Sequence, residues 1–229
     1  MGFFVICLKR RFAEKSVFCV YRLIFRYMDV NIAALAAVEH GFKTFEIEAQ
    51  KIVEQQGVFD SKEKALSLLH HNLYQVRACG VFILGFIAWK DATVLPVLKE
   101  TARSDQSWQV QEIVAKAFDQ YCKDIGYEKA LPEIRSWLKD KDPNVCRAVT
   151  EGLRIWTSRP YFKTNPEVAI QLISQHKASD SAYLRKSVGN ALRDIGKKHI
   201  QLVNKEISGW NLTDKRIAFT RGYACKNVD

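Results

Sequence analysis

Residues 142–156 read DPNVCRAVTEGLRIW, and this stretch decides the fold. Asp142 and Pro143 form a helix-start signal, and the apolar residues that follow are spaced with a helical period. A similar sequence, YLRKSVGNALRDI, occupies residues 183–195. Both stretches carry arginines among their apolar residues. The chain therefore contains the same arginine-bearing helix more than once.

Two further stretches have the same pattern: LYQVRACGVFILGFI at 73–87 and WQVQEIVAKAFDQY at 108–121. When the four helices are superposed, the positions that coincide are Val76, Val110, Val145 and Leu184. The steps between these positions are 34, 35 and 39 residues. A self-similar period of this size, built from two helices, is typical of a HEAT-type solenoid.

A first helix is expected before each of the last three second helices, and another helix pair follows them. The first helices are predicted at 92–104, 129–140 and 166–176, and the last pair at 198–210 and 213–226. Almost no segment shows the alternation of a β-strand. The sequence thus predicts an all-α, HEAT-like helical-repeat solenoid over residues 28–229.

Residues 1–27 form a basic and apolar N-terminal extension. The segment could be an amphipathic helix on a membrane surface. It could also lie upstream of the true start, because Met28 opens an ordinary helical region. Its apolar residues precede Lys9, Arg10 and Arg11, which is the reverse of a secretory signal. We favour the upstream extension.

Several classes of protein are excluded by composition. No apolar run approaches the roughly 20 residues that span a bilayer. None of the six cysteines lies in a CxxC motif or at zinc-ligand spacing, so we expect a reduced, cytoplasmic protein without disulfides. Phosphate-binding loops and hydrolase motifs are missing as well. We expect no metal, no cofactor, no membrane partner and a monomer.

The net charge of +10 and the isoelectric point near 9.3 favour a phosphate-rich partner. In helical solenoids the second helices line the concave surface, which is the usual binding face. The predicted second helices are repeatedly basic, so a basic concave groove that holds duplex DNA is expected. The alternative is that these cations form salt bridges between helices, in a HEAT-type scaffold for protein–protein contacts.

Over residues 29–226 the chain resembles the bacterial AlkD-like DNA alkylation repair family. Members of that family are HEAT-like solenoids, and its AlkD members excise alkylated purines. The resemblance is strongest at 144–226, in the segments NVCRAVTEGL, YLRKSVGNALRDIGKKHIQLVNKEI and LTDKRIAF. It implies DNA, duplex or branched, as the partner.

The family's DNA-contacting arginine falls on Arg147 of this sequence. The resemblance therefore implies that Arg147 contacts the DNA backbone. Arg154, Lys186 and Arg193 lie on the same repeated helices and are expected to support it.

The family's catalytic aspartate lies in a Ser-Trp-Trp-Asp-Ser-Val-Asp segment. The most similar segment of this sequence is SDQSWQVQEIV at 104–114. Alignment of the following Ile-Val pair places Gln111 at the aspartate. The candidate carboxylates are then Glu112, next to it, and Asp105, upstream. Trp108 keeps one aromatic of this segment, whereas a second aromatic of the family's lesion cleft falls on Asn190.

These departures bear on the chemistry. Excision of an alkylated purine builds positive charge on the sugar, which a carboxylate stabilises and a neutral glutamine does not. Asn190 likewise offers no aromatic face to a cationic base. The sequence therefore supports DNA binding better than alkylpurine DNA glycosylase activity.

The segment TSRPYFKTNP at 157–166 accounts for the long 39-residue step. It mixes Arg159 and Lys163 with Tyr161 and Phe162. Such a loop could press into a DNA groove or stack on bases. Alternatively, its aromatic side chains could be tucked onto the solenoid.

Overall fold

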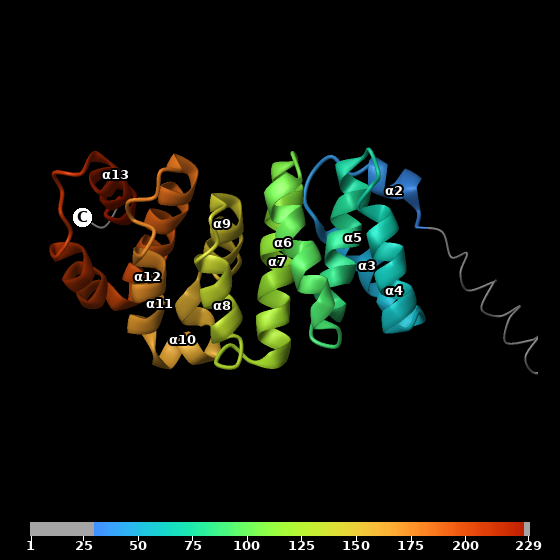
Figure 1. Ribbon diagram of the computed structural model, residues 1–229, viewed down its shortest axis with the longest axis horizontal. Coiled ribbons are helices and arrows are strands. Elements are labelled where there is room, and N and C mark those ends of the chain that lie inside the picture. Colours follow the sequence, from blue (N-terminus) through green and yellow to red (C-terminus); the bar gives the residue numbers. More distant parts are fainter. Residues whose placement is uncertain (1–29, 227–229) are drawn as a thin grey trace, which may run out of the picture.

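The computed structural model describes residues 30–226, and every regular element in that range is a helix. The helices stand side by side along the long axis of the molecule in the order of the sequence (Figure 1). α2, α3 and α4 lie at one end, and α12 and α13 lie at the other. The all-α, helical-repeat prediction is confirmed. The predicted extension at 1–27 lies outside the described residues.

Two sets of helices build the stack. The first set is α2 (Ile32–Ala36), α4 (Val58–Leu68), α6 (Leu95–Ser104), α8 (Leu131–Leu138) and α11 (Pro166–Ser174). The second set is α3 (Lys43–Gln55), α5 (Tyr74–Ile87), α7 (Trp108–Ile125), α9 (Pro143–Gly152) and α12 (Ala182–Ser208), followed by α13 (Lys215–Ala224). Each helix of the second set packs on the next, from α3 through α13. A short 3₁₀ helix, η1 (Ala92–Val94), precedes α6.

The superposed positions of the sequence repeat share one environment. Val76, Val110, Val145 and Leu184 are all buried. These side chains fill the space between the two layers of helices, where burial of apolar surface stabilises the fold.

Small residues allow the second helices to approach closely. A Cβ atom on Gly85 of α5 would lie 2.7 Å from the Cβ atom of Ala117 on α7. A Cβ atom on Gly152 of α9 would collide with the backbone carbonyl of Ala115 on α7. Glycine at these two contacts therefore sets the spacing of α5, α7 and α9.

The side chain one residue after each superposed position contacts the turn that precedes its own helix. Four side chains at this position each donate a hydrogen bond to a backbone carbonyl in the turn before their helix: Arg77, Gln111, Cys146 and Arg185. For Gln111 the acceptor is the carbonyl of Asp105, at 3.0 Å. This repeated position satisfies backbone carbonyls of the turn that joins each first helix to its second helix. Arg77, although it is one of the cations of the second helices, is directed at its own turn and at Asp105 in the turn after α6.

Two helix boundaries differ from the prediction. The helix expected to reach residue 156 ends at Gly152, and the helices expected at 183–195 and 198–210 are merged in α12 across non-helical backbone at His199. Proline begins α10 (Pro160–Thr164), which was not predicted, and the predicted helix α11, because its fixed φ suits the first helical turn. The 3₁₀ helix η2 (Trp156–Ser158) joins α9 to α10.

The aromatic residues of the 157–166 segment are tucked onto the solenoid. Phe162 is fully buried and packs edge-on against the ring of Trp156, with 4.9 Å between centroids. The structure therefore agrees with the second of the two interpretations of this segment.

Candidate nucleic-acid interface

Three second helices present equivalent side chains on one face. Glu112, Arg147 and Lys186 each lie two residues after a superposed position. Residues four and seven positions further along a helix share its face. Arg154 follows the end of α9 and lies beside Glu151 in the lining of one pocket. We call the resulting set the second-helix face; it comprises Glu112, Lys116, Asp119, Arg147, Glu151, Arg154, Lys186, Asn190 and Arg193.

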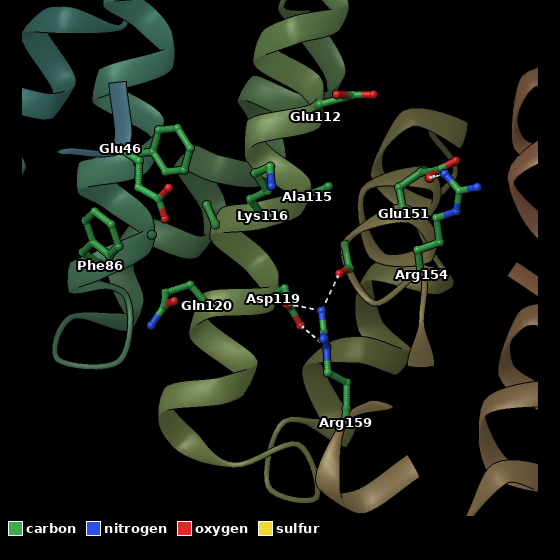
Figure 2. A pocket seen from close by; sticks show the side chains of 14 residues that line it. Glu46, Phe86, Glu112, Ala115, Lys116, Asp119, Gln120, Glu151, Arg154 and Arg159 are labelled. Atoms are coloured by element: carbon green, nitrogen blue, oxygen red, sulfur yellow. Dashed lines mark hydrogen bonds and ion pairs between the residues drawn. The ribbon is translucent and has the colours of Figure 1, made fainter. Parts of the chain in front are cut away.

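A pocket of about 360 Å³ opens on this face between α5, α7 and α9 (Figure 2). Its acidic lining residues are Glu46, Glu112, Asp119 and Glu151, and its basic ones are Lys116, Arg154 and Arg159. Phe82 and Phe86 add apolar surface. This part of the face therefore has mixed charge, whereas we expected a basic concave groove.

Arg147 is held in an unusual way for a surface cation. It is only 7% exposed, and its guanidinium carbon lies 4.0 Å from the ring centroid of Tyr183 at the start of α12. Its buried Nε has no hydrogen-bond partner, and within residues 30–226 no carboxylate pairs with it. The cation–π contact fixes the plane of the guanidinium but does not neutralise its charge.

Arg154, by contrast, is neutralised. Its Nε donates to Oδ2 of Asp194 at 3.0 Å, and its Nη1 lies 3.9 Å from Oε2 of Glu151. Burial would raise the pKa of Asp194, but hydrogen bonds from Lys197 and Arg154 outweigh it and the pKa is lowered. Oε1 of Glu151 accepts a hydrogen bond of 2.6 Å from Ser187. Arg154 thus joins the turn after α9 to α12, as the salt-bridge interpretation expected for some of the cations.

Arg159 ties the segment after α9 to α7. It donates from Nε and Nη2 to the two carboxylate oxygens of Asp119, at 3.0 and 2.6 Å, as Figure 2 shows. Tyr127 donates a third hydrogen bond to Asp119 at 3.0 Å. Burial raises the pKa of Asp119 in spite of these contacts. The pair closes one wall of the pocket and leaves Asp119 no free oxygen.

The two candidate carboxylates occupy different places. Asp105 lies at the end of α6, where it accepts from Nε and Nη2 of Arg77 at 2.7 and 3.0 Å and from the backbone of Ser107. Its side chain is 8% exposed. Glu112 is partly exposed, lines the pocket and has no hydrogen bond or ion pair within the described residues. The structure does not bring the two carboxylates together.

Of the other predicted site residues, Trp108 and Gln111 lie outside the second-helix face, and three lie on it. Trp108 is 55% exposed at the start of α7, and Gln111 is directed at the turn before that helix. Asn190 and Arg193 are partly buried on the second-helix face, whereas Lys186 is exposed there. The Nζ of Lys186 lies 5.9 Å from the ring centroid of Tyr223 on α13.

Tyr183 and Tyr223 were not singled out from the sequence. The spacing between Tyr183 and Lys186 in the sequence could have identified Tyr183 as a site residue. Tyr183 lies three residues before Lys186, on the same side of α12 as the predicted DNA-contacting residues.

Positive charge is concentrated at one end of the solenoid. Residues 30–181 contain as many acidic as basic side chains, 19 of each. Residues 182–226, which form α12 and α13, contain ten Lys and Arg against three Asp and Glu. A polyanion is therefore attracted mainly to the end of the face that follows Arg147.

Within residues 30–226 no helix is long and apolar enough to cross a membrane. In the same range there is no cluster of three or more His, Cys, Asp and Glu side chains that could hold a metal ion.

The stacked helix pairs and the cation-bearing second-helix face define a HEAT-like helical-repeat protein. The family model described as "DNA alkylation repair enzyme" matches residues 30–227, and the chain belongs to this family. The structure is similar to AlkD2 from Streptococcus mutans, with 45% identity, a TM-score of 0.83, and coverage of 85% of this chain and 94% of that one.

A second similar structure is smu.31 from Streptococcus mutans UA159. It is 44% identical with a TM-score of 0.79, over 82% of this chain and 92% of that one. The uncharacterized protein YhaZ of Bacillus subtilis (strain 168) is 32% identical over 90 residues. That match spans 38% of this chain but only a quarter of the length of YhaZ.

Proposed function

We propose that this protein acts in DNA alkylation repair by binding duplex DNA on its second-helix face, with Arg147 as the central contact to the backbone. Membership of the DNA alkylation repair family supports a repair function. The position of Arg147, on the central helix α9, supports its role as the contact.

The observation that carries the proposal is the unpaired state of Arg147. A buried cation without a counter-charge costs free energy, and the cost is recovered when an anion approaches. Arg147 is 7% exposed and keeps an unsatisfied Nε, so it is already partly desolvated. A phosphate is a suitable anion, because the planar guanidinium binds phosphate oxygens with paired hydrogen bonds.

Lys186 and Arg193 extend this contact along α12. Neither side chain has an ion pair within the described residues, and both lie on the same face as Arg147. Arg154 contributes less in this proposal, since Asp194 and Glu151 already accept its charge.

Equilibrium binding to a blunt duplex at several salt concentrations tests the proposal. Release of condensed counterions predicts that log K falls linearly with log salt, by about 0.9 for each phosphate that is neutralised. We expect log K against log salt to have a slope of about −3 or steeper. The contacts behind it are those of Arg147, Lys186, Arg193 and the remaining cations of residues 182–226. Absence of binding at low salt would sink the proposal and favour a scaffold for protein–protein contacts.

Excision of alkylated purines is a second candidate function, and one observation favours testing it at Glu112. Glu112 is the candidate carboxylate that faces the pocket unpaired, one helix away from Arg147. We propose that any excision uses Glu112 to stabilise the positive charge on the sugar. Release of methylated purines by the wild type, lost in Glu112→Gln and kept in Glu128→Gln on an exposed turn, tests this assignment.

A further inference from the structure

Two cations of the second-helix face lie over aromatic rings of the next helix. Arg147 of α9 covers Tyr183 of α12, with 4.0 Å from guanidinium carbon to ring centroid. Lys186 of α12 lies 5.9 Å from the ring centroid of Tyr223 on α13. Cations and rings thus alternate across three successive helices. We call Arg147, Tyr183, Lys186 and Tyr223 the cation–aromatic ladder.

A neighbouring pair widens the ladder at its α13 end. The guanidinium carbon of Arg185 lies 5.0 Å from the ring centroid of Phe219. The rings of Phe219 and Tyr223 are themselves 5.0 Å apart. Phe219 therefore joins Tyr223 in one aromatic surface beside two cations.

These rings are accessible. Tyr183 is 48% exposed and Phe219 is 38% exposed, although large apolar surfaces are usually buried. Arg147 covers only one face of the ring of Tyr183, so ring surface remains open to a ligand. The surrounding segment 182–226 holds ten basic side chains against three acidic ones. The ligand that fits is an anionic chain that also carries flat apolar rings.

Single-stranded nucleic acid has this combination. A duplex presents phosphates but keeps its bases stacked inside, so it leaves the ladder's rings without a partner. An unpaired strand exposes the π-faces of its bases, which stack on aromatic side chains while the cations follow the phosphates. An acidic peptide or an anionic membrane surface would satisfy the charge but would not supply regularly spaced aromatic rings.

We propose that the cation–aromatic ladder binds an unpaired DNA strand next to the duplex, with bases stacked on Tyr183 and on the Phe219–Tyr223 surface. The inference rests on the proposed function, since the duplex is placed on the same face. It assigns the protein a preference for DNA in which one strand has lost its pairing partner.

The test compares three DNAs: a blunt duplex, the same duplex with a single-stranded tail of about six thymidines, and the duplex with an equally long abasic tail. Both tails carry the same phosphates, so a difference between them reports base stacking alone. We expect the thymidine tail to bind roughly tenfold more tightly than the abasic tail, the effect of about one stacked base. Tails at either end of the duplex are measured by fluorescence anisotropy.

The triple variant Tyr183→Ala/Phe219→Ala/Tyr223→Ala, which removes every ring of the proposed site, should bind both tails equally. Tyr183→Phe should keep the preference, because phenylalanine also stacks. Phe59→Ala is the matched control: Phe59 is 67% exposed on α4, at the opposite end of the solenoid, and its loss should leave the ratio unchanged. The ratio of the two tails cancels any loss of phosphate contacts, and circular dichroism verifies that each variant is folded.

Equal affinity of the wild type for both tails would overturn the inference, as would a preference that survives in the triple variant. The blunt duplex separates this failure from that of the proposed function. If it binds with strong salt dependence while the tails are equal, duplex binding stands and the ladder inference falls. If only the thymidine tail is bound, the ladder inference stands and duplex binding falls.

Discussion

Arg147 and Tyr183 form a stacked pair that joins α9 to the start of α12, with the guanidinium carbon 4.0 Å from the ring centroid. Tyr183 limits the rotamers of Arg147 without neutralising its charge. The cation is thus held in place before any anion arrives. Preorganisation of this kind lowers the entropy lost on binding.

We expect Arg147→Ala to weaken binding to blunt duplex DNA and to make the slope of log K against log salt shallower by about 0.9, because one phosphate contact is lost. Arg147→Lys should keep most of the slope but bind less tightly, since an ammonium lacks the planar fork of arginine. Anisotropy titrations between roughly 50 and 200 mM salt measure both quantities. Arg135→Ala, an exposed arginine of α8, should leave the slope near that of the wild type. An unchanged slope in Arg147→Ala would contradict the assignment.

Asp105 is expected to matter for stability. Asp105→Asn breaks a nearly buried, two-pronged ion pair and leaves Arg77 without its carboxylate. Arg77 keeps two backbone carbonyls as partners, so we expect a loss of about 2–4 kcal/mol in the free energy of unfolding. Urea denaturation measures this change.

Glu112→Gln serves as the comparison for Asp105→Asn, because Glu112 has no partner to lose within the described residues. Its free energy of unfolding should stay within about 0.5 kcal/mol of the wild type. Similar losses in both variants would show that Glu112 has a structural role too.

The repeat was predictable from the sequence because it depends on local features, namely the helical period and the recurrence of apolar positions. Whether a charged side chain is free to bind a ligand could not be predicted from the sequence, since this depends on partners far along the chain. Asp105 is paired across 28 residues with Arg77, and Arg154 across 40 residues with Asp194. Tyr183 was missed for the same reason, because its contact with Arg147 exists only once α9 and α12 are packed.

Helix boundaries after Gly152 escaped prediction for a related reason. The apolar period continues through Leu153 and Trp156, so the sequence favoured one longer helix. In the structure Trp156 is buried against Phe162, and Arg159 is directed at Asp119. The local Trp156–Phe162 contact and the ion pair of Arg159 with the distant Asp119 stabilise the short helices η2 and α10 over a continued α9.

Stability should fall on mild acidification because of His176. Burial lowers the pKa of His176, although a backbone interaction with Leu138 opposes the shift, and its Nε2 has no hydrogen-bond partner. The folded state therefore favours neutral imidazole more than the unfolded state does. Its contribution is complete above the unfolded pKa of about 6.5 and is lost as the pH falls through the lower folded value.

Urea midpoints measured from about pH 7.5 to pH 5 check this expectation. His176→Gln should be less sensitive to pH than the wild type, whereas the exposed His40→Gln should respond as the wild type does. An equally steep loss of stability in His176→Gln would show that other groups dominate the response.

Gly152→Ala should disturb both the fold and the DNA-binding face. The added Cβ would collide with the backbone carbonyl of Ala115, which cannot move aside as a flexible side chain does. We expect a loss of about 1–3 kcal/mol in the free energy of unfolding, typical of overpacking. Because the collision pushes α9 away from α7, Arg147 and Glu112 should separate and duplex affinity should fall as well.

Gly222→Ala is the matched control: this glycine of α13 has open space around a Cβ, and alanine there should stabilise the helix by up to about 1 kcal/mol. Denaturation curves and duplex titrations of the two variants measure these effects, and a Gly152→Ala protein as stable as the wild type would show that the second helices can be spread without cost.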